Sequence, residues 1–438
     1  MASSRAAAPS RWSRLGLLSQ VDFRRLWVGE TISQFGSQVS ILAIPYIAAK
    51  LLLVSPFEVS LLVALQFLPF LLLTLPAGAW LDRMRRRPVL ISGDLVRLVA
   101  LVTIPLAWTL GALTIWQLYL VSFVTGIATV FFDVAYQSYL PSLVERNELV
   151  EGNGKLQASE AAAGVVGPGL GGALISLVGA PFAVIADALS YLASAVFVSR
   201  IERQEPHPEA ERRAAGLTRE PLRRQVAEGL SFVLQNPYLR AIAGATSSSN
   251  LFSNMVWGIL PVFLYRELGL SAATAGVIFG LGALGTLVGA LVANRIASRI
   301  GLGAAIVGSI ALDGPAWLLL AAAPHGAAVP WLVASFALGG WSSVVYNINQ
   351  VSFRQAICPT AIQGRMNATM RFLVWGTIPI GSILGGLVAT VVGVHNAIWI
   401  GAFGSCLAFL SVLLSPVRSL RAMPEPLSEA EPATASGA

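Results

Sequence analysis

A short, arginine-rich stretch decides how the chain is organised: Gly78-Ala79-Trp80-Leu81-Asp82-Arg83-Met84-Arg85-Arg86-Arg87-Pro88. It separates two apolar runs, residues 57–80 and 89–108. Each run is long enough to cross a bilayer, because a spanning helix needs about 20 mainly apolar residues. Arginine-rich short loops between spanning helices lie in the cytoplasm. The stretch therefore predicts a tight cytoplasmic turn between two spans.

The composition agrees with this interpretation. Of the 438 residues, 55% are hydrophobic and only 12% are charged, which is about half the charge of an average soluble domain. The chain is therefore expected to be a polytopic membrane protein embedded in a lipid bilayer. The net charge of +7 comes from basic residues gathered in turns and tails, so it does not indicate nucleic-acid binding.

The sequence contains no sign of an enzyme, a metal site or a cofactor. It has no phosphate-cradling loop and no nucleophile–base pair. Cys358 and Cys406 lack the spacing of metal ligands, and two cysteines in apolar surroundings predict no disulfide framework. Residues 1–25 have no apolar core before a cleavage site, so no signal peptide is expected.

Twelve apolar segments predict an all-α membrane protein of twelve transmembrane helices. The predicted spans are residues 27–49, 57–80, 89–109, 113–138, 155–178, 181–200, 238–265, 272–294, 303–323, 329–352, 366–392 and 395–415. A polar linker divides them six and six. The predicted domains are a tail at 1–26, a bundle at 27–200, the linker at 201–237, a second bundle at 238–415 and a disordered tail at 416–438. Within the linker, residues 220–234 have the spacing of an amphipathic helix on a membrane surface.

The basic residues predict the orientation. With the N-terminus inside, 27 of the 29 Lys and Arg residues lie in cytoplasmic segments or adjoining helix ends, and only Lys50 and Arg266 lie outside. So strong a bias predicts an even number of spans and two cytoplasmic termini. We therefore expect a multi-pass protein of the inner (cytoplasmic) membrane.

The two halves resemble each other at a nearly constant offset. Asp82-Arg83 align with Asn294-Arg295 at an offset of 212, and Gly171-Gly172 align with Gly385-Gly386 at an offset of 214. Internal repeats of this kind are common in transporters, where a cleft lies between the halves near mid-membrane. The chain is interpreted as two six-helix pseudo-repeats.

The arginine-rich turn resembles the cytoplasmic loop signature of the major facilitator superfamily, Gly-x-x-x-Asp-Arg-x-x-Arg-Arg. The matching residues are Gly78, Asp82, Arg83, Arg86 and Arg87. The chain departs from the pattern at Arg85, where many members have glycine. The resemblance implies a twelve-helix, major-facilitator-like fold that works by alternating access.

A second stretch, in the fifth predicted span, resembles the motif associated with exporters and antiporters of that superfamily. It contains Gly167, Pro168, Gly171 and Gly172. Glycines at this spacing also let helices approach closely in lipid, which is a purely structural alternative. Proline kinks the helix at this point.

Three further stretches are similar to the branch that contains the enterobactin exporter and macrolide efflux proteins. They are residues 131–141, which end the fourth predicted span, residues 353–357 and residues 364–372. The resemblance covers about residues 23–416. It implies secondary active export of a small amphipathic organic molecule, drug-like or siderophore-like, with protons as the coupling ion.

A cytoplasmic gate is predicted around the arginine-rich turn. Asp133 falls at the cytoplasmic end of its span, where an unpaired acid is costly, so we expect it to pair with Arg86 or Arg83. Asp82 is expected to meet the N-terminus of the eleventh span, because helix N-termini attract carboxylates.

Acids inside the spans are the candidates for proton coupling, because burial and substrate can change their protonation. We consider Glu30, Asp187 and Asp313, and favour Glu30 because the superfamily lines its cavity with the first, fourth, seventh and tenth spans. Asp94 and Arg97 are expected to pair with each other. Arg371 is a candidate to replace an arginine that drug antiporters often have in the fourth span, or to bind an anionic substrate group.

Polar and aromatic residues on the cavity-lining spans predict a site for an amphipathic molecule. The candidates are Gln34, Gln38, Asn250, Asn254, Trp341, Tyr346 and Asn347. Hydrogen bonding between helices is the alternative role for each of them. The partners expected are a small-molecule substrate and protons, and the protein is expected to be a monomer. A facilitator or importer of the same fold, and a non-transporting membrane partner protein, remain alternatives.

Overall fold

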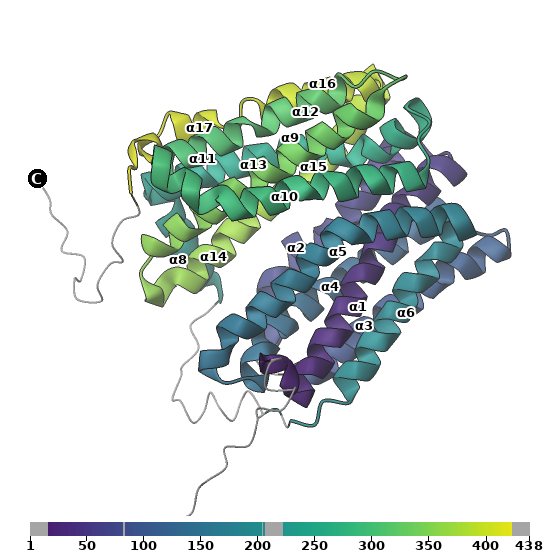
Figure 1. Ribbon diagram of the computed structural model, residues 1–438, viewed down its shortest axis with the longest axis horizontal. Coiled ribbons are helices and arrows are strands. Elements are labelled where there is room, and N and C mark those ends of the chain that lie inside the picture. The colour runs from purple at the N-terminus through teal and green to yellow at the C-terminus, as the bar shows by residue number, and fades with distance from the viewer. Residues whose placement is uncertain (1–15, 82–83, 204, 206–221, 423–438) are drawn as a thin grey trace, which may run out of the picture.

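The computed structural model describes residues 16–81, 84–203, 205 and 222–422. The N-terminal bundle in Figure 1 consists of α1 (Val21–Tyr46), η2 (Ile47–Leu51), α2 (Pro56–Leu81), α3 (Arg86–Thr109), α4 (Ile115–Leu143), α5 (Leu149–Val178) and α6 (Ala180–Ser199). The C-terminal bundle consists of α9 (Pro237–Val262), η4 (Phe263–Glu267), α10 (Ala272–Ile300), α11 (Leu302–Ala311), α12 (Asp313–Ala321), α13 (Ala328–Ala356), α14 (Thr360–Trp375), α15 (Thr377–Val392), α16 (Val394–Ser405) and α17 (Leu410–Leu413). In the sequence, α8 (Leu222–Gln235) falls between the two bundles.

Helical segments occupy all twelve positions predicted as spans. Within the described residues, ten helical segments are long and apolar enough to cross a membrane by length and composition. The segments outside that set are α1 and α9, which have unusually many polar residues, including Glu30 and the run 246–250. The all-helical fold is confirmed, and for α1 and α9 the assignment as spans stays a prediction.

Three spans of the C-terminal bundle are each built from two helices. The break between α11 and α12 falls at Leu312, so that Asp313 begins the second helix. The break between α14 and α15 falls at Gly376. The bundles are therefore less alike in detail than the sequence repeat suggests.

The hydrophobic core shows how the two bundles meet. At the end that contains η2 and η4, called here the η2–η4 end, one apolar cluster joins the bundles and includes Ile47, Ala48 and Phe263. At the opposite end, called the α8 end, each bundle has a separate cluster of its own. In Figure 1, α5 and α10 accordingly converge on the right and separate on the left. Among the described residues, the core cluster shared by the two bundles is therefore the one at the η2–η4 end.

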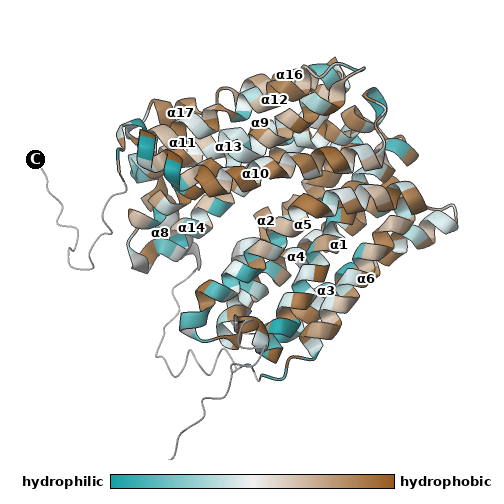
Figure 2. Cartoon of the chain, viewed as in Figure 1, coloured by the Kyte–Doolittle hydropathy of each residue, from teal (hydrophilic) through white to brown (hydrophobic). Residues whose placement is uncertain are grey.

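Hydropathy also changes between the middle of the helices and the α8 end. Figure 2 shows α10 largely brown along its length, with teal segments at its left end, near α8. Apolar side chains such as Val99, Leu120 and Leu291 are exposed on α3, α4 and α10, and their exposure is expected of surfaces that contact lipid.

The linker is anchored to both bundles. Arg203 donates a hydrogen bond to the carbonyl of Leu143 in α4 over 2.7 Å. Glu228 of α8 pairs with Arg365 of α14 and with Arg224 of α8, and the hydrogen bond from Arg224 lowers the pKa of Glu228. A helix lies where residues 220–234 were predicted to be amphipathic, but it packs against α14.

The tails differ from the prediction at their inner ends. α1 begins at Val21, six residues inside the segment expected to be a tail. The segment expected to be disordered from residue 416 contains η5 (Pro416–Ser419), and Val417 is fully buried. It packs because Gly303 lets the chain approach α11 closely and donates its N–H to the carbonyl of Leu420 over 2.8 Å. The disorder prediction is therefore wrong for residues 416–422.

Candidate functional site

A cavity of about 670 Å³ lies between the two bundles. Side chains from α1, α2 and α5 line one side, and side chains from α9, α10, α12 and α13 line the other. Leu264 and Tyr265 of η4 belong to the lining, so the sealed η2–η4 end limits the cavity on that side. The volume is within the range of pockets that hold drug-sized molecules, about 300–1,000 Å³.

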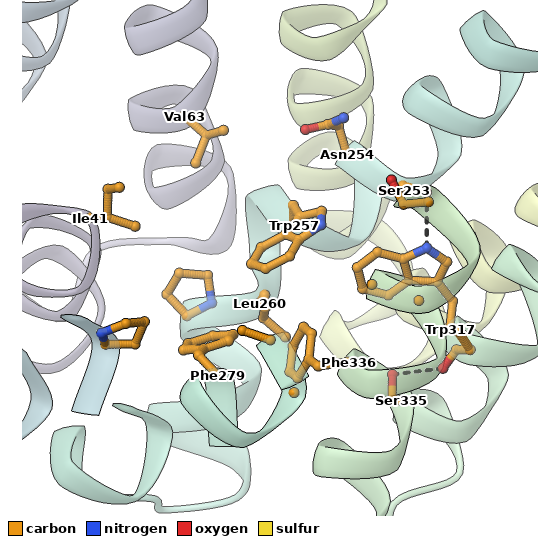
Figure 3. Close-up of a pocket in the computed structure, with 18 of the residues that line it drawn as sticks. Ile41, Val63, Ser253, Asn254, Trp257, Leu260, Phe279, Trp317, Ser335 and Phe336 are labelled. Atoms are coloured by element: carbon orange, nitrogen blue, oxygen red, sulfur yellow. Dashed lines mark hydrogen bonds between the residues drawn. The ribbon is translucent and has the colours of Figure 1, made fainter. Parts of the chain in front are cut away.

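Four aromatic side chains form one wall, called here the aromatic wall: Trp257, Phe279, Trp317 and Phe336. Trp257 contacts each of the other three, with ring centroids 5.6–6.0 Å apart. Phe279 and Phe336 meet edge to face at 4.8 Å. Figure 3 shows these four rings from different helices turned toward the same space. Sequence reasoning missed the wall, because its members come from α9, α10, α12 and α13.

Asp313 is the one charged side chain in the lining, as far as the structure describes the chain. Its Oδ2 atom accepts hydrogen bonds from Ser249, over 2.8 Å, and from Ser253, over 3.2 Å. Ser253 also accepts the indole N–H of Trp317 over 2.9 Å, a bond drawn in Figure 3. Within the described part of the chain, Asp313 forms no ion pair. The carboxylate is thus oriented by hydroxyl groups and linked to the aromatic wall.

The predicted cavity residues separate into two groups. Gln38, Asn250 and Asn254 line the cavity. Gln34 is not part of the lining: it lies one turn from Gln38, and its amide donates to Glu30 over 2.6 Å. Asn250 also donates to the carbonyl of Val374 over 2.9 Å, so it supports α14 as well.

The three candidates on α13 lie outside the lining. Tyr346 is buried, and its hydroxyl is 2.7 Å from that of Thr246 on α9. Asn347 is exposed one turn beyond Ser343, which does line the cavity. Trp341 is half-buried. The structural alternative, hydrogen bonding between helices, describes the position of Tyr346.

The glycine-rich motif of α5 forms the seam where α5 meets α10. A Cβ atom on Gly172 would collide with the carbonyl of Ala272, and one on Gly276 would collide with the carbonyl of Pro168. At Gly280 the carbonyl of Val165 would be 2.8 Å from an added Cβ. On the other face of α5, Gly167 and Gly171 let α1 approach. The motif therefore permits backbone contact between the bundles.

Lys50 and Arg266, the two basic residues predicted to lie on the same side, form a reciprocal clasp at the η2–η4 end. Lys50 of the N-terminal bundle donates to the carbonyl of Tyr265 over 3.0 Å. Arg266 of the C-terminal bundle donates to the carbonyl of Val54 over 2.6 Å and to that of Ala49. Tyr46 and Tyr265 meet edge to face beside them at 4.7 Å. This clasp holds the end shut.

Acids gather around one arginine inside the N-terminal bundle. Asp94 is fully buried and pairs with Arg97 over 2.6 Å, as predicted from their spacing. The guanidinium also lies over the rings of Phe132 and Tyr191, at 4.3 and 4.2 Å. The acids near enough to interact with it electrostatically, besides Asp94, are Glu30, Asp133 and Asp187.

Two carboxylate oxygens in this acid cluster lack partners. Glu30 Oε2 and Asp94 Oδ2 are buried without a hydrogen-bond partner among the described residues. Asp187 accepts from Ser190 over 3.2 Å and lies 3.5 Å from the hydroxyl of Ser37. The cluster holds four acids and one arginine, and it does not line the cavity.

The gate residues are only partly described. Asp82 and Arg83 lie outside the described residues, and Gly78 belongs to α2 close to its end at Leu81. The guanidinium of Arg86 pairs with Glu205 of the linker over 3.3 Å, and Arg87 donates to the carbonyl of Ser199. The predicted pair between Arg86 and Asp133 is therefore absent from this conformation.

Asp133 and Arg371 are the remaining candidates near the gate, and neither takes part in the ion pair between Arg86 and Glu205. Asp133 makes no ion pair within the described chain, although Arg97 and Arg371 are close enough to interact with it electrostatically. Arg371 places its guanidinium 5.2 Å from the ring centroid of Trp375. Asp133 thus faces both its own bundle and α14.

Glu205 acts as a cap for α3, a role that sequence reasoning missed. Its buried carboxylate accepts the backbone N–H of Arg86 over 2.7 Å and that of Arg87 over 3.2 Å. Residue Arg85, at the start of the helix, supplies no side-chain cap. An acid at a helix N-terminus satisfies unpaired N–H groups and the helix dipole.

Replacing Glu205 with alanine is expected to speed hydrogen exchange at the amides of Arg86 and Arg87. The loss should cost about 1 kcal/mol, the usual value of a helix N-terminal cap. Exchange measured by mass spectrometry on peptides covering residues 84–90 tests this. Glu202→Ala is the control, because that side chain is 81% exposed and pairs with Arg25 instead. Equal exchange in both variants would show that Glu205 does not cap α3.

Two helical bundles with a mostly apolar cavity between them are the architecture of a membrane transporter. Among the described residues, no group of His, Cys, Asp and Glu could hold a metal ion. Residues 12–435 match the transmembrane secretion effector family of the major facilitator superfamily, and the chain belongs to that family.

Relatives and a solved structure agree with the assignment. The chain is 22% identical to macrolide efflux protein A of Streptococcus pyogenes over 415 residues, covering 92% of this chain and 98% of that protein. It is 24% identical to the enterobactin exporter EntS of Citrobacter koseri, covering 94% and 95%. A bacterial homologue of the iron transporter ferroportin, crystallised in an inward-facing state, has a TM-score of 0.71 at 17% identity, covering 90% and 98%. The recognition from sequence motifs is confirmed, as is the major-facilitator-like fold.

Proposed function

We propose that this transporter exports a small amphipathic organic molecule by alternating access, driven by proton entry. The observation that carries the proposal is the cavity between the bundles, which is sealed at the η2–η4 end by the clasp and the α5–α10 seam. Apolar and aromatic side chains with a few amides and hydroxyls suit an amphipathic molecule. The efflux proteins named among its relatives support the outward direction.

The two ends of the molecule would alternate. In the described conformation the bundles have separate cores at the α8 end, which we take as the cytoplasmic side. In the opposite conformation Arg86 would leave Glu205 and pair with Asp133, and Asp82 would reach the N-terminus of α14. Gly78, Arg83 and Arg87 would complete that gate. The clasp and the seam would then open toward the outside.

Proton coupling is assigned to the intramembrane acids. Glu30 belongs to the acid cluster, where Arg97 is shared by Glu30, Asp94, Asp133 and Asp187. One guanidinium cannot neutralise four carboxylates, so the cluster can hold protons in a low-dielectric interior. Asp313 lines the cavity itself, where a proton and a substrate can exclude each other. Rearrangement of the gate near Asp133 and Arg371 would link the cluster to the α8 end.

Uptake into inside-out vesicles tests this function. With a panel of hydrophobic drugs and siderophores, we expect accumulation that collapses when an uncoupler is added. Glu30→Gln and Asp313→Asn are each expected to reduce the uncoupler-sensitive uptake at least tenfold, on the order of one lost charge interaction in a low dielectric. Asp22→Asn makes the same chemical change near the start of α1 and serves as the control.

The outcomes separate the alternatives. Uptake that ignores the uncoupler but follows the substrate gradient indicates a facilitator, and uptake only in right-side-out vesicles indicates an importer. No flux of any compound, together with a co-purifying protein, indicates a non-transporting partner. Each of these results would overturn the proposed proton-driven export.

A further inference from the structure

We propose that the preferred substrate is a lipophilic organic monocation, whose charge is bound by Asp313 and whose apolar groups pack against the aromatic wall. This inference rests on the proposed function, because it names the substrate class of the same cavity. The wall consists of Trp257, Phe279, Trp317 and Phe336.

The charges around the cavity define the sign of the ligand. Asp313 is the one acid among the described residues of the lining, and none of these residues is a lysine, arginine or histidine. A carboxylate removed from water needs a counter-charge or a proton. Because the described protein supplies no cation there, a positively charged substrate can supply it. An anionic substrate would meet a carboxylate and no opposite charge.

The carboxylate is held so that one oxygen remains for a ligand. Both serine hydroxyls, of Ser249 and Ser253, donate to Oδ2. Oδ1 accepts no hydrogen bond within the described chain. Unlike Glu30 Oε2 and Asp94 Oδ2, this unpartnered oxygen is accessible at its surface. Two fixed hydroxyls limit rotation of the carboxylate, so Oδ1 is oriented in advance of binding.

The aromatic wall favours the same ligand class. The face of a tryptophan ring attracts a cation, and tryptophan is the best of the aromatic residues at this. Trp317 lies one turn after Asp313 on α12, and Trp257 contacts Trp317 at 5.8 Å. A large organic cation can therefore place its charge near Asp313 and its rings against the wall. The cavity, about 670 Å³, has room for several rings.

A metal cation does not fit the donor set. Hard divalent cations take about six to eight oxygen ligands, usually with more than one carboxylate. Here one carboxylate faces an apolar wall, and the described residues contain no cluster of metal-binding side chains. The monovalent charge and the apolar surroundings together select an organic cation.

Equilibrium binding to the purified full-length protein in nanodiscs tests the inference, because it needs no gradient and no transport. The probes are radiolabelled tetraphenylphosphonium, rhodamine 6G and ethidium as cations, and triphenylphosphine oxide as a neutral relative of the first. Protein-free nanodiscs of the same lipid give the background. We expect tetraphenylphosphonium to bind at least tenfold more tightly than the neutral compound, the order of a desolvated charge contact.

Variants locate the site. Asp313→Asn is expected to weaken cation binding about 30-fold or more, as loss of one partner of a buried charge pair does, and to leave the neutral compound unaffected. Asp313→Glu keeps the charge and should retain most of the binding. Trp257→Ala should weaken both probes. Asp22→Asn should change neither of them.

Two results would overturn the proposal: binding of none of the three cations above background, or a neutral compound bound as tightly as the cation by the wild-type protein. The second comparison needs no variant, so it remains decisive if Asp313→Asn fails to fold. Cation binding with no vesicle transport would support the cation preference and contradict the proposed export. Transport of neutral compounds without a preference for cations would support the export and contradict the cation preference.

Discussion

Replacing Gly276 with leucine is expected to abolish transport while both bundles stay folded. A Cβ atom on Gly276 would collide with the backbone carbonyl of Pro168, which cannot move without displacing α5. Overpacking of this kind costs about 1–3 kcal/mol. The penalty applies only when α5 and α10 are in contact, so it disfavours the conformation sealed at the η2–η4 end. The shift in population would be about 5- to 150-fold.

Cysteine labelling measures the change in conformation that is expected to cause this loss of transport. With Cys358 and Cys406 replaced, a cysteine at Ser253 reports access to the cavity. We expect an impermeant maleimide added from the η2–η4 side to react faster in the Gly276→Leu variant, because the seam no longer closes. Gly169→Leu is the matched control: Gly169 lies on α5 within the same motif, but an added Cβ there would meet nothing within 4 Å. Transport by Gly276→Leu at the wild-type rate would show that the seam is not part of the cycle.

The glycine motif illustrates what the sequence could and could not provide. Its spacing predicted a close helix contact, and the structural and functional interpretations were both left open. The structure identifies the partner, because Gly172 meets Ala272 of the other bundle whereas Gly171 meets Val39 of the same bundle. Sequence spacing defines one face of a helix but not the helix that covers it.

Local pairs were predictable and distant ones were not. Asp94 and Arg97 are three residues apart on α3, and a helix brings them together wherever it packs. Glu205 and Arg86 are 119 residues apart, and no periodic pattern connects them. The cap on α3 depends on how the linker leaves α6, which is a property of the folded chain.

Asp313 shows how a helix break can change a functional assignment. In the sequence its span was predicted as one helix, and Asp313 was one of three candidates for proton coupling, with Glu30 favoured over it. The break at Leu312 divides that span into α11 and α12. Asp313 then lies beside Ser249 and Ser253 of α9 and lines the cavity. The polar run on α9 was the signal in the sequence that could have indicated this site, because serine hydroxyls inside a span require hydrogen-bond acceptors.

Replacing Arg97 with methionine is expected to destabilise the protein by about 3–5 kcal/mol, the cost of leaving a buried charge without its partner. Asp94 is fully buried and has no other cation within ion-pair distance in the described chain. Thermal unfolding of the purified protein, followed by tryptophan fluorescence, measures the loss. The stability of Arg97→Lys should fall between those of the wild-type protein and Arg97→Met. Lysine keeps the charge but loses the guanidinium stacked between Phe132 and Tyr191, which is worth about 0.5–2 kcal/mol.

The double variant Asp94→Asn/Arg97→Met separates a simple ion pair from a shared cluster. If Arg97 served Asp94 alone, removing both charges would restore nearly all of the stability, because buried pairs can be replaced by neutral groups at little cost. Glu30, Asp133 and Asp187 also lie within electrostatic range of Arg97, so we expect the recovery to be partial. Complete recovery would mean that those three acids do not depend on Arg97. A single variant as stable as wild type would refute the cluster altogether, and the proton-holding role proposed for it would have to move to Asp313.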